Sequence, residues 1–103
     1  MEISASRDAD ILRLELHGAL DLVTADIVAQ RVEQALAEKP AELILDLRNV
    51  KFCDSAGIHI MLRARNAAHR QGSRFRIDNV HGIIRRSLEI TGVLAVLTAG
   101  TDA

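Results

Sequence analysis

The sequence predicts a small α/β domain in which helices pack against one mixed, mostly parallel β-sheet. Segments with the two-residue period of a strand alternate with segments of helical period, which is typical of an open sheet with right-handed crossovers. The chain has 103 residues, enough for one hydrophobic core and too few for two. We therefore expect a single domain over residues 1–103, with its core between residues 11 and 97.

Composition and charge exclude several functional classes. Apolar residues make up 49% of the chain and charged residues 26%, as in an ordinary folded domain. The net charge of −1 provides no attraction for nucleic acid or an anionic membrane. No apolar run approaches the ~20 residues that span a bilayer, so we expect no membrane insertion. Cys53 is the single cysteine, which favours a cytoplasmic protein without a disulfide.

The histidines do not indicate a metal site, because their spacing matches no recurring ligand pattern. We therefore expect neither a metal nor another cofactor. The four are His17, His59, His69 and His81.

The first half of the chain predicts two strands around one helix. Residues Ile11 to Gly18 alternate with period two and predict a half-buried strand, which Ala19 to Val23 extend as a second short strand. Thr24 is a favourable N-cap for a helix that Pro40 ends. The nearly continuous apolar run from Glu42 to Leu47 suits a central strand covered on both faces. The apolar face of the helix comprises Val28, Val32, Ala35 and Leu36.

The second half predicts two further helices, each followed by a glycine at the position that commonly ends a helix, Gly72 and Gly92. Phe75 and Ile77 share one face of the strand between them. In order, we expect a loop over residues 48–54, a helix from Gly57 to Arg70, a strand over 73–80, a helix over 82–92 with Ile84 and Leu88 inward, a short strand over 93–97 and a loose tail from Thr98 to Ala103.

Ser55 is the main candidate for a functional residue. It follows the predicted central strand, and open α/β sheets place their sites at the carboxyl ends of strands. A hydrolase elbow needs glycine two positions before the serine, where Cys53 stands. A nucleotide-binding loop needs several glycines and a lysine, which are missing around Ser55. We therefore expect no catalytic residues, and the protein is not predicted to be an enzyme.

Two interpretations of Ser55 stay open on the residues alone. As a helix N-cap, its hydroxyl accepts a bond from an amide one turn into the helix, which stabilises by about 1 kcal/mol. As a phosphorylation switch, it receives about −1.5 to −2 charges at a helix start whose amides and dipole tolerate them. The new charge beside Asp54 would then repel a partner surface while the fold stays unchanged.

The stretch LDLRNVKFCDSAGIHIML resembles the signature of the STAS domain, the family of bacterial anti-sigma factor antagonists. That family reads L-D-L, a short loop with an aromatic or apolar residue, and D-S-x-G-L. Here ILDL, Phe52 and DSAGI fill those places, and GALD, from Gly18 to Asp21, stands where the family has G-E-L-D. The resemblance runs from about Ile11 to Leu97 and implies the sporulation-antagonist-like fold.

The resemblance implies a protein that binds an anti-sigma factor and so releases a sigma factor, in transcription regulation such as a stress response. The anti-sigma factor is often a serine kinase, which phosphorylates Ser55 and breaks the complex, and a phosphatase restores it. Asp54 and Asp21 are implied at the docking edge. Gly57 is expected to let the partner backbone come close.

Two departures from the family pattern bear on partner choice. Ala19 replaces the usual glutamate, which removes a charge from the docking edge. His59 stands where the family has a small residue, one turn beyond Ser55 and on one polar helix face with Arg63. That face is either simply solvated, or His59 and Arg63 contact the phosphate or discriminate between partners.

Three further alternatives remain. Ile60 lies at the margin of the predicted buried helix face and is either core edge or an apolar anchor for the partner. Cys53 is either loop packing or a redox sensor. In function, the fold and length equally suit an accessory subunit of a membrane ABC-type transporter or a stressosome-like scaffold component, although serine at position 55 favours the antagonist.

Overall fold

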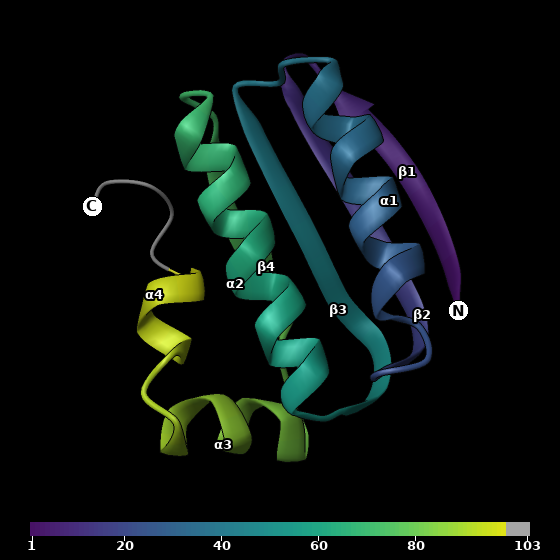
Figure 1. The fold of residues 1–103 in the computed structure, drawn as a ribbon, viewed down its shortest axis with the longest axis vertical. Coiled ribbons are helices and arrows are strands. Elements are labelled where there is room, and N and C mark those ends of the chain that lie inside the picture. Colours follow the sequence, from purple (N-terminus) through teal and green to yellow (C-terminus); the bar gives the residue numbers. More distant parts are fainter. Residues whose placement is uncertain (99–103) are drawn as a thin grey trace.

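The computed structural model describes residues 1–98, which form a four-stranded sheet with helices (Figure 1). The strand order is β1-β2-β3-β4, with β1 antiparallel to β2 and with β3 parallel to both of its neighbours. This confirms the predicted mixed, mostly parallel α/β sheet. The elements are β1 Glu2–Asp8, β2 Ile11–Leu20, α1 Ala25–Ala37, β3 Glu42–Cys53, α2 Ser55–Arg70, β4 Arg74–Asp78, α3 Gly82–Ile90 and α4 Leu94–Thr98.

The first strand, β1, was not predicted. It is an edge strand that pairs only with β2, and six of its seven residues are exposed. Because neither face of β1 is strongly buried, its sequence lacks the apolar alternation that identifies a half-buried strand. Ala9, with a φ of 55°, lies in the tight turn that returns the chain into β2.

Two predicted boundaries near the end of β2 and β3 are wrong. Ala19 and Leu20 belong to β2 itself, and the following residues turn into α1, so no separate short strand exists there. The loop expected over residues 48–54 is largely strand, because β3 continues to Cys53 beside the end of β2. The sequence did not predict this continuation because Arg48 and Asn49 are polar and exposed, so the apolar run that indicates a buried strand ends at Leu47.

The strand predicted over residues 93–97 is also wrong, because α4 occupies most of this segment. A short apolar run does not distinguish a strand from a buried helical turn by its periodicity. α4 packs against β4 and buries Leu97 completely. Of the expected tail, Thr98 is the last residue of α4, and the remainder lies outside the described residues.

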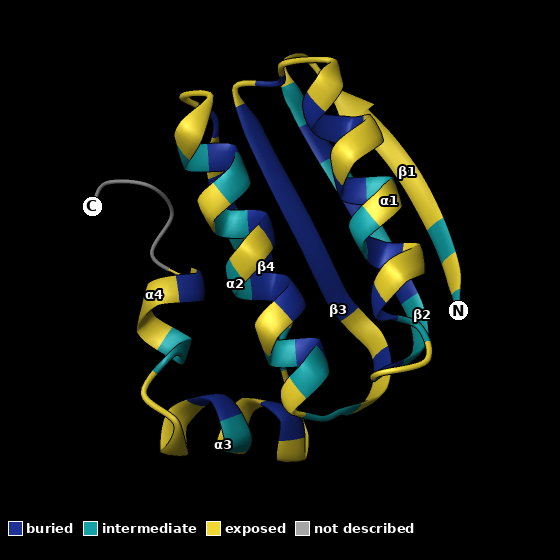
Figure 2. Cartoon of the chain, viewed as in Figure 1, coloured by how far each residue is buried: buried dark blue, intermediate teal, exposed yellow. Residues whose placement is uncertain are grey.

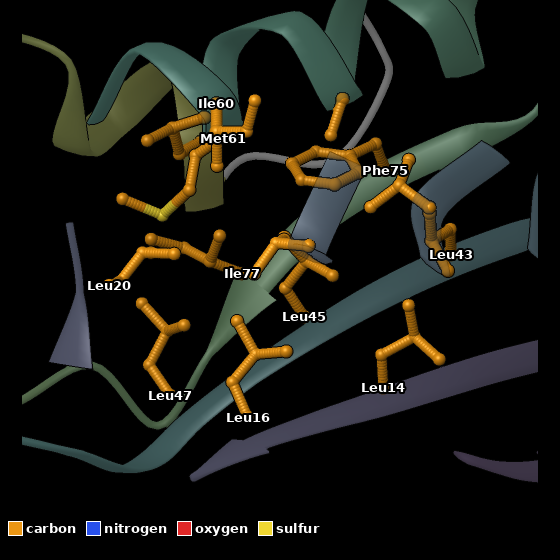
Figure 3. Packing of buried hydrophobic residues seen from close by; sticks show 14 of the residues in the cluster. Leu14, Leu16, Leu20, Leu43, Leu45, Leu47, Ile60, Met61, Phe75 and Ile77 are labelled. Atoms are coloured by element: carbon orange, nitrogen blue, oxygen red, sulfur yellow. The ribbon is translucent and has the colours of Figure 1, made fainter. Parts of the chain in front are cut away.

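The main core lies between the sheet and the helices α1 and α2, which run side by side over one sheet face (Figures 1 and 2). The predicted inward residues of α1 and α3 are all buried, as are Phe75 and Ile77 of β4. Each fully buried leucine stabilises the fold by roughly 1.5–3 kcal/mol. Figure 3 shows the centre of this core, with Leu14, Leu16, Leu20, Leu43, Leu45, Leu47, Ile60, Met61, Phe75 and Ile77 labelled.

The other side of β3 is buried by charged side chains. Arg13 of β2 donates to Asp46 at 2.9 Å and to Asp78 of β4 at 3.1 Å, and so bridges three strands. Arg76 pairs in the same way with the buried Glu42 at 3.0 Å. The prediction that β3 is covered on both faces is therefore confirmed, with the core leucines on one face and the ion pairs together with the buried Ile44 on the other.

Asp46 is the most enclosed acid of this network, with a side chain only 3% exposed. Burial alone would raise its pKa, but hydrogen bonds from Asn79, from the Arg48 amide and from Arg13 together lower it. A lowered folded-state pKa means that folding favours the ionised carboxylate, so the stabilisation is present at neutral pH and lost as the pH falls through that pKa.

We predict that Asp46→Asn lowers the unfolding free energy at pH 7 by about 2 kcal/mol, because Arg13 loses its buried partner. Urea unfolding between pH 7 and pH 3 should also show that the variant loses less stability on acidification than the wild type. Asp8→Asn, at an exposed position of β1, is the matched control and should leave both quantities unchanged. Identical acid dependence in wild type and Asp46→Asn would contradict this account.

Candidate functional site

The N-cap of α2 is Asp54, and the interpretation of Ser55 as the cap is wrong. Asp54 has an extended backbone, and its Oδ1 accepts a hydrogen bond from the Gly57 amide at 3.0 Å. α2 therefore begins at Ser55, two residues earlier than expected, and Ser55 is exposed as its first residue. The Asp54 carboxylate thus satisfies an amide in the first turn of α2, which is what an N-cap side chain does. The Ser55 hydroxyl is thus not needed to start the helix.

The start of α2 is fixed against the end of β2. Leu20 pairs with Cys53 in the sheet, and its carbonyl accepts a hydrogen bond from the Asp54 amide at 3.2 Å. A Cβ on Gly57 would lie 2.4 Å from that same carbonyl oxygen and 2.8 Å from Cys53 Sγ. Gly57 is buried, so the expectation that it admits a partner backbone is wrong. Its missing side chain lets the first turn of α2 press against Leu20.

Asp21 organises the turn that follows Leu20. Its Oδ1 accepts hydrogen bonds from the amides of Val23 and Thr24 at 3.0 and 3.1 Å. Thr24 stands at the N-cap position of α1 as predicted, but its hydroxyl donates to the Ala19 carbonyl and makes no capping bond. Asp21 lies at the same sheet edge as Asp54, because Leu20 and Cys53 are paired neighbours.

Exposed apolar side chains lie at the ends of β2 and β3, the strand ends next to the start of α2. Leu22 and Val23, in the turn after β2, are 78% and 83% exposed, and Phe52 near the end of β3 is 51% exposed. One end of the molecule, the lower end in Figure 1, contains the ends of β2 and β3, the start of α2, and α3. Sequence reasoning did not assign Leu22 and Val23 to the site. An apolar pair within a turn was the available signal, since turns are usually polar.

The helix face beyond Ser55 is polar and exposed at His59 and Arg63, as predicted. Side chains on a helix tilt toward its N-terminus, so His59 leans toward Ser55 one turn away. Ile60 is only 5% exposed and belongs to the core cluster. This fits the interpretation of Ile60 as core edge.

Cys53 is half-buried and packs against the core, as the packing interpretation requires. Burial, helped by the charge of Asp54, raises the pKa of the Cys53 thiol to about 11. A thiol with this pKa is protonated at neutral pH and is therefore a poor nucleophile. The structure thus disfavours a redox sensor at this position.

Two kinds of feature are absent from the part of the chain that the structure describes. No helix within residues 1–98 is long and apolar enough to cross a membrane. Within the same residues, no three His, Cys, Asp or Glu side chains gather as they would around a metal ion.

Comparison with known proteins relates almost the whole chain to one family. The model of the STAS domain matches residues 2–101. The anti-sigma F factor antagonist of Paenibacillus polymyxa is 24% identical over 98 residues, which cover 94% of this chain and 84% of the relative. The anti-sigma-B factor antagonist of Bacillus subtilis is 21% identical over 97 residues, covering 94% and 88% of the two chains.

Solved structures share the fold. An anti-sigma factor antagonist from Mycobacterium paratuberculosis superposes with a TM-score of 0.83 at 23% identity, covering 93% of this chain and 81% of that one. SpoIIAA from Bacillus, 16% identical, matches in its unphosphorylated form with a TM-score of 0.79, covering 94% and 85% of the two chains. Its phosphorylated form matches with a TM-score of 0.72, covering 94% and 88%. A sulfate transporter family protein from Wolinella succinogenes gives 0.72 at 21% identity, covering 89% and 75%.

We predict that the capping residue can be identified by two single substitutions. Asp54→Ala should lower the unfolding free energy by about 1 kcal/mol, because the Gly57 amide loses its acceptor. Ser55→Ala, one position away on the exposed first turn, should change it by less than about 0.5 kcal/mol. Urea unfolding measures both values. A larger loss for Ser55→Ala than for Asp54→Ala would show that the hydroxyl is a structural cap after all.

A second prediction concerns Gly57. Alanine normally stabilises a helix relative to glycine by up to about 1 kcal/mol. Here Gly57→Ala should instead destabilise by about 2–3 kcal/mol, because the added Cβ overlaps the Leu20 carbonyl. Adding Cys53→Ala should recover little of this loss, since the backbone overlap remains. If Gly57→Ala proves as stable as the wild type, the close contact with Leu20 does not exist.

Proposed function

We propose that this chain, which belongs to the STAS domain family, is an anti-sigma factor antagonist switched by phosphorylation of Ser55. It would bind an anti-sigma factor that is also a serine kinase, and so release the sigma factor. The names of its relatives, which are anti-sigma factor antagonists, support this class of partner. The single observation that supports the switch is that Ser55 is exposed as the first residue of α2, while Asp54 is the N-cap.

The exposed apolar side chains at the ends of β2 and β3 suit a protein interface. Leu22, Val23 and Phe52 expose apolar surface that a partner can bury, and buried apolar surface supplies most of the free energy of association. A phosphate on Ser55 would place about −1.5 to −2 charges within this surface. The partner would then have to desolvate a dianion next to Asp54. Binding would weaken for this reason, although the fold would not change.

The remaining predicted residues take supporting positions in this proposal. Asp21 and Asp54 would hold the two loops of the docking edge in place through their backbone hydrogen bonds. His59, one turn beyond Ser55, would approach the phosphate or the partner, and Arg63 would contact the partner farther along α2. The whole chain would act as a single regulatory domain in the cytoplasm, without catalysis of its own. A phosphatase would remove the phosphate and restore binding.

The test combines phosphorylation with binding. Each serine-kinase anti-sigma factor of the source organism is purified and incubated with the protein and ATP, and mass spectrometry locates the phosphate. We predict modification at Ser55 and a loss of affinity of at least about a hundredfold for Ser55→Asp, the energetic scale of an interfacial charge left unpaired. Ser55→Ala should bind like the wild type and stay unmodified. Circular dichroism should show that both variants keep the native fold.

Two outcomes would contradict the proposal. Equal binding of Ser55→Asp and the wild type to every anti-sigma factor would exclude the switch. Co-purification of the native protein with a transporter ATPase or a multi-subunit scaffold, with no anti-sigma factor bound, would instead favour an accessory or scaffold function.

A further inference from the structure

A groove lies between α1 and α2, and among its lining residues the proposed Ser55 switch uses Arg63 alone. Its volume is about 200 Å³, and it is open to solvent on one side. The residues at its base are mostly small, so the two helices leave room between them. Its apolar lining includes Ala29 and Val32 of α1 and Ile60, Ala64 and Ala67 of α2.

The two walls of the groove carry opposite charge. Arg63 and Arg70 line the α2 side, seven residues apart and therefore about 10 Å along the helix axis. Glu33 lines the α1 side. All three side chains are exposed. A ligand in the groove thus meets a basic wall on one side, an acidic wall on the other and an apolar floor between them.

The size of the groove favours side chains of a protein over a free small molecule. Sites for small ligands typically enclose about 300–1,000 Å³ and surround most of the ligand. A cavity of about 150 Å³ holds a molecule as small as benzene. A groove of about 200 Å³ therefore has room for about one bulky apolar side chain, which is how an amphipathic helix anchors in a hydrophobic groove.

On α2, the groove begins at Ile60, a little more than one turn beyond Ser55. Arg63 belongs to the polar face of α2 that starts beside Ser55, and Ile60 on the groove floor lies one turn closer to Ser55 than Ala64. α1 and α2 both run upward in Figure 1 from that same end of the molecule. A partner that covers Ser55 therefore needs only a short extension to reach the groove.

We propose that the groove receives an amphipathic helical segment of the anti-sigma factor, with an apolar anchor on the floor, carboxylates toward Arg63 and Arg70, and a basic residue toward Glu33. This inference rests on the proposed function, since it describes a second contact of the same partner. The opposite charges of the two walls fix the direction in which the helix lies. A helix bound in the opposite direction would place its carboxylates beside Glu33 and its basic residue beside Arg63 and Arg70, where like charges repel.

The experiment uses variants outside the Ser55 edge. Ala67→Phe fills the groove and Arg70→Glu reverses its basic wall, whereas Ala37→Phe and Arg74→Glu are matched controls at exposed positions that do not line it. Isothermal titration measures the affinity of each variant for the anti-sigma factor that binds the wild type. Both groove variants should bind about tenfold more weakly, and both controls should bind like the wild type.

A photo-crosslinking residue in place of Ala29 should in addition attach to a helical, acidic segment of the anti-sigma factor. Groove variants that bind like the wild type, while Ser55→Asp still fails to bind, would overturn the groove inference and leave the proposed function intact. Equal weakening by the controls would overturn it too. A wild-type protein that sediments as a dimer and becomes monomeric on Arg70→Glu would show that a second copy occupies the groove instead.

Discussion

The contact between the carbonyl of Leu20 and the first turn of α2 determines the geometry of the candidate site. The Leu20 carbonyl accepts a hydrogen bond from the Asp54 amide. Gly57 lets α2 approach that carbonyl more closely than a residue with a Cβ would allow. With the helix held there, Asp54 caps it and Ser55 faces solvent. The contact also brings Asp21 and its turn beside α2, because Asp21 follows Leu20 directly. The site is thus assembled by backbone packing together with the hydrogen bonds that the Asp21 and Asp54 side chains accept from backbone amides.

Both faces of the sheet stabilise the fold, and the candidate recognition surface lies instead where β2 and β3 end. One face is packed by α1 and α2 around leucines of the central strands, and the other is tied by ion pairs that bridge β2, β3 and β4. Neither arrangement depends on Ser55. Apolar side chains are instead left exposed where β2 and β3 end, at Leu22, Val23 and Phe52. A charge added at that edge therefore changes what can dock there without disturbing either face of the sheet.

Much of this architecture could be predicted from the sequence, because strands and helices that bury a regular apolar face carry a regular pattern. Residues 42–47 and the inward positions of α1 and α3 followed it. The edge strand β1 buries too few residues to show an apolar alternation. The five-residue α4 is too short to show a helical period. At the site, the motif identified Ser55 as the candidate residue but not the structural roles of its neighbours. That Asp54 is the cap, and that Gly57 serves internal packing, depends on contacts with Leu20 that are distant in sequence.

The proposed switch requires that Ser55 carries a phosphate while the fold stays the same. The most direct measurement compares amide NMR spectra of the protein with serine and with translationally incorporated phosphoserine at position 55. The account predicts shifts confined to the first turns of α2 and the adjoining turn after β2, with the amides of β2, β3 and β4 unchanged. Shifts or lost hydrogen-exchange protection across those strands would contradict it, because the phosphate would then act by disturbing the scaffold.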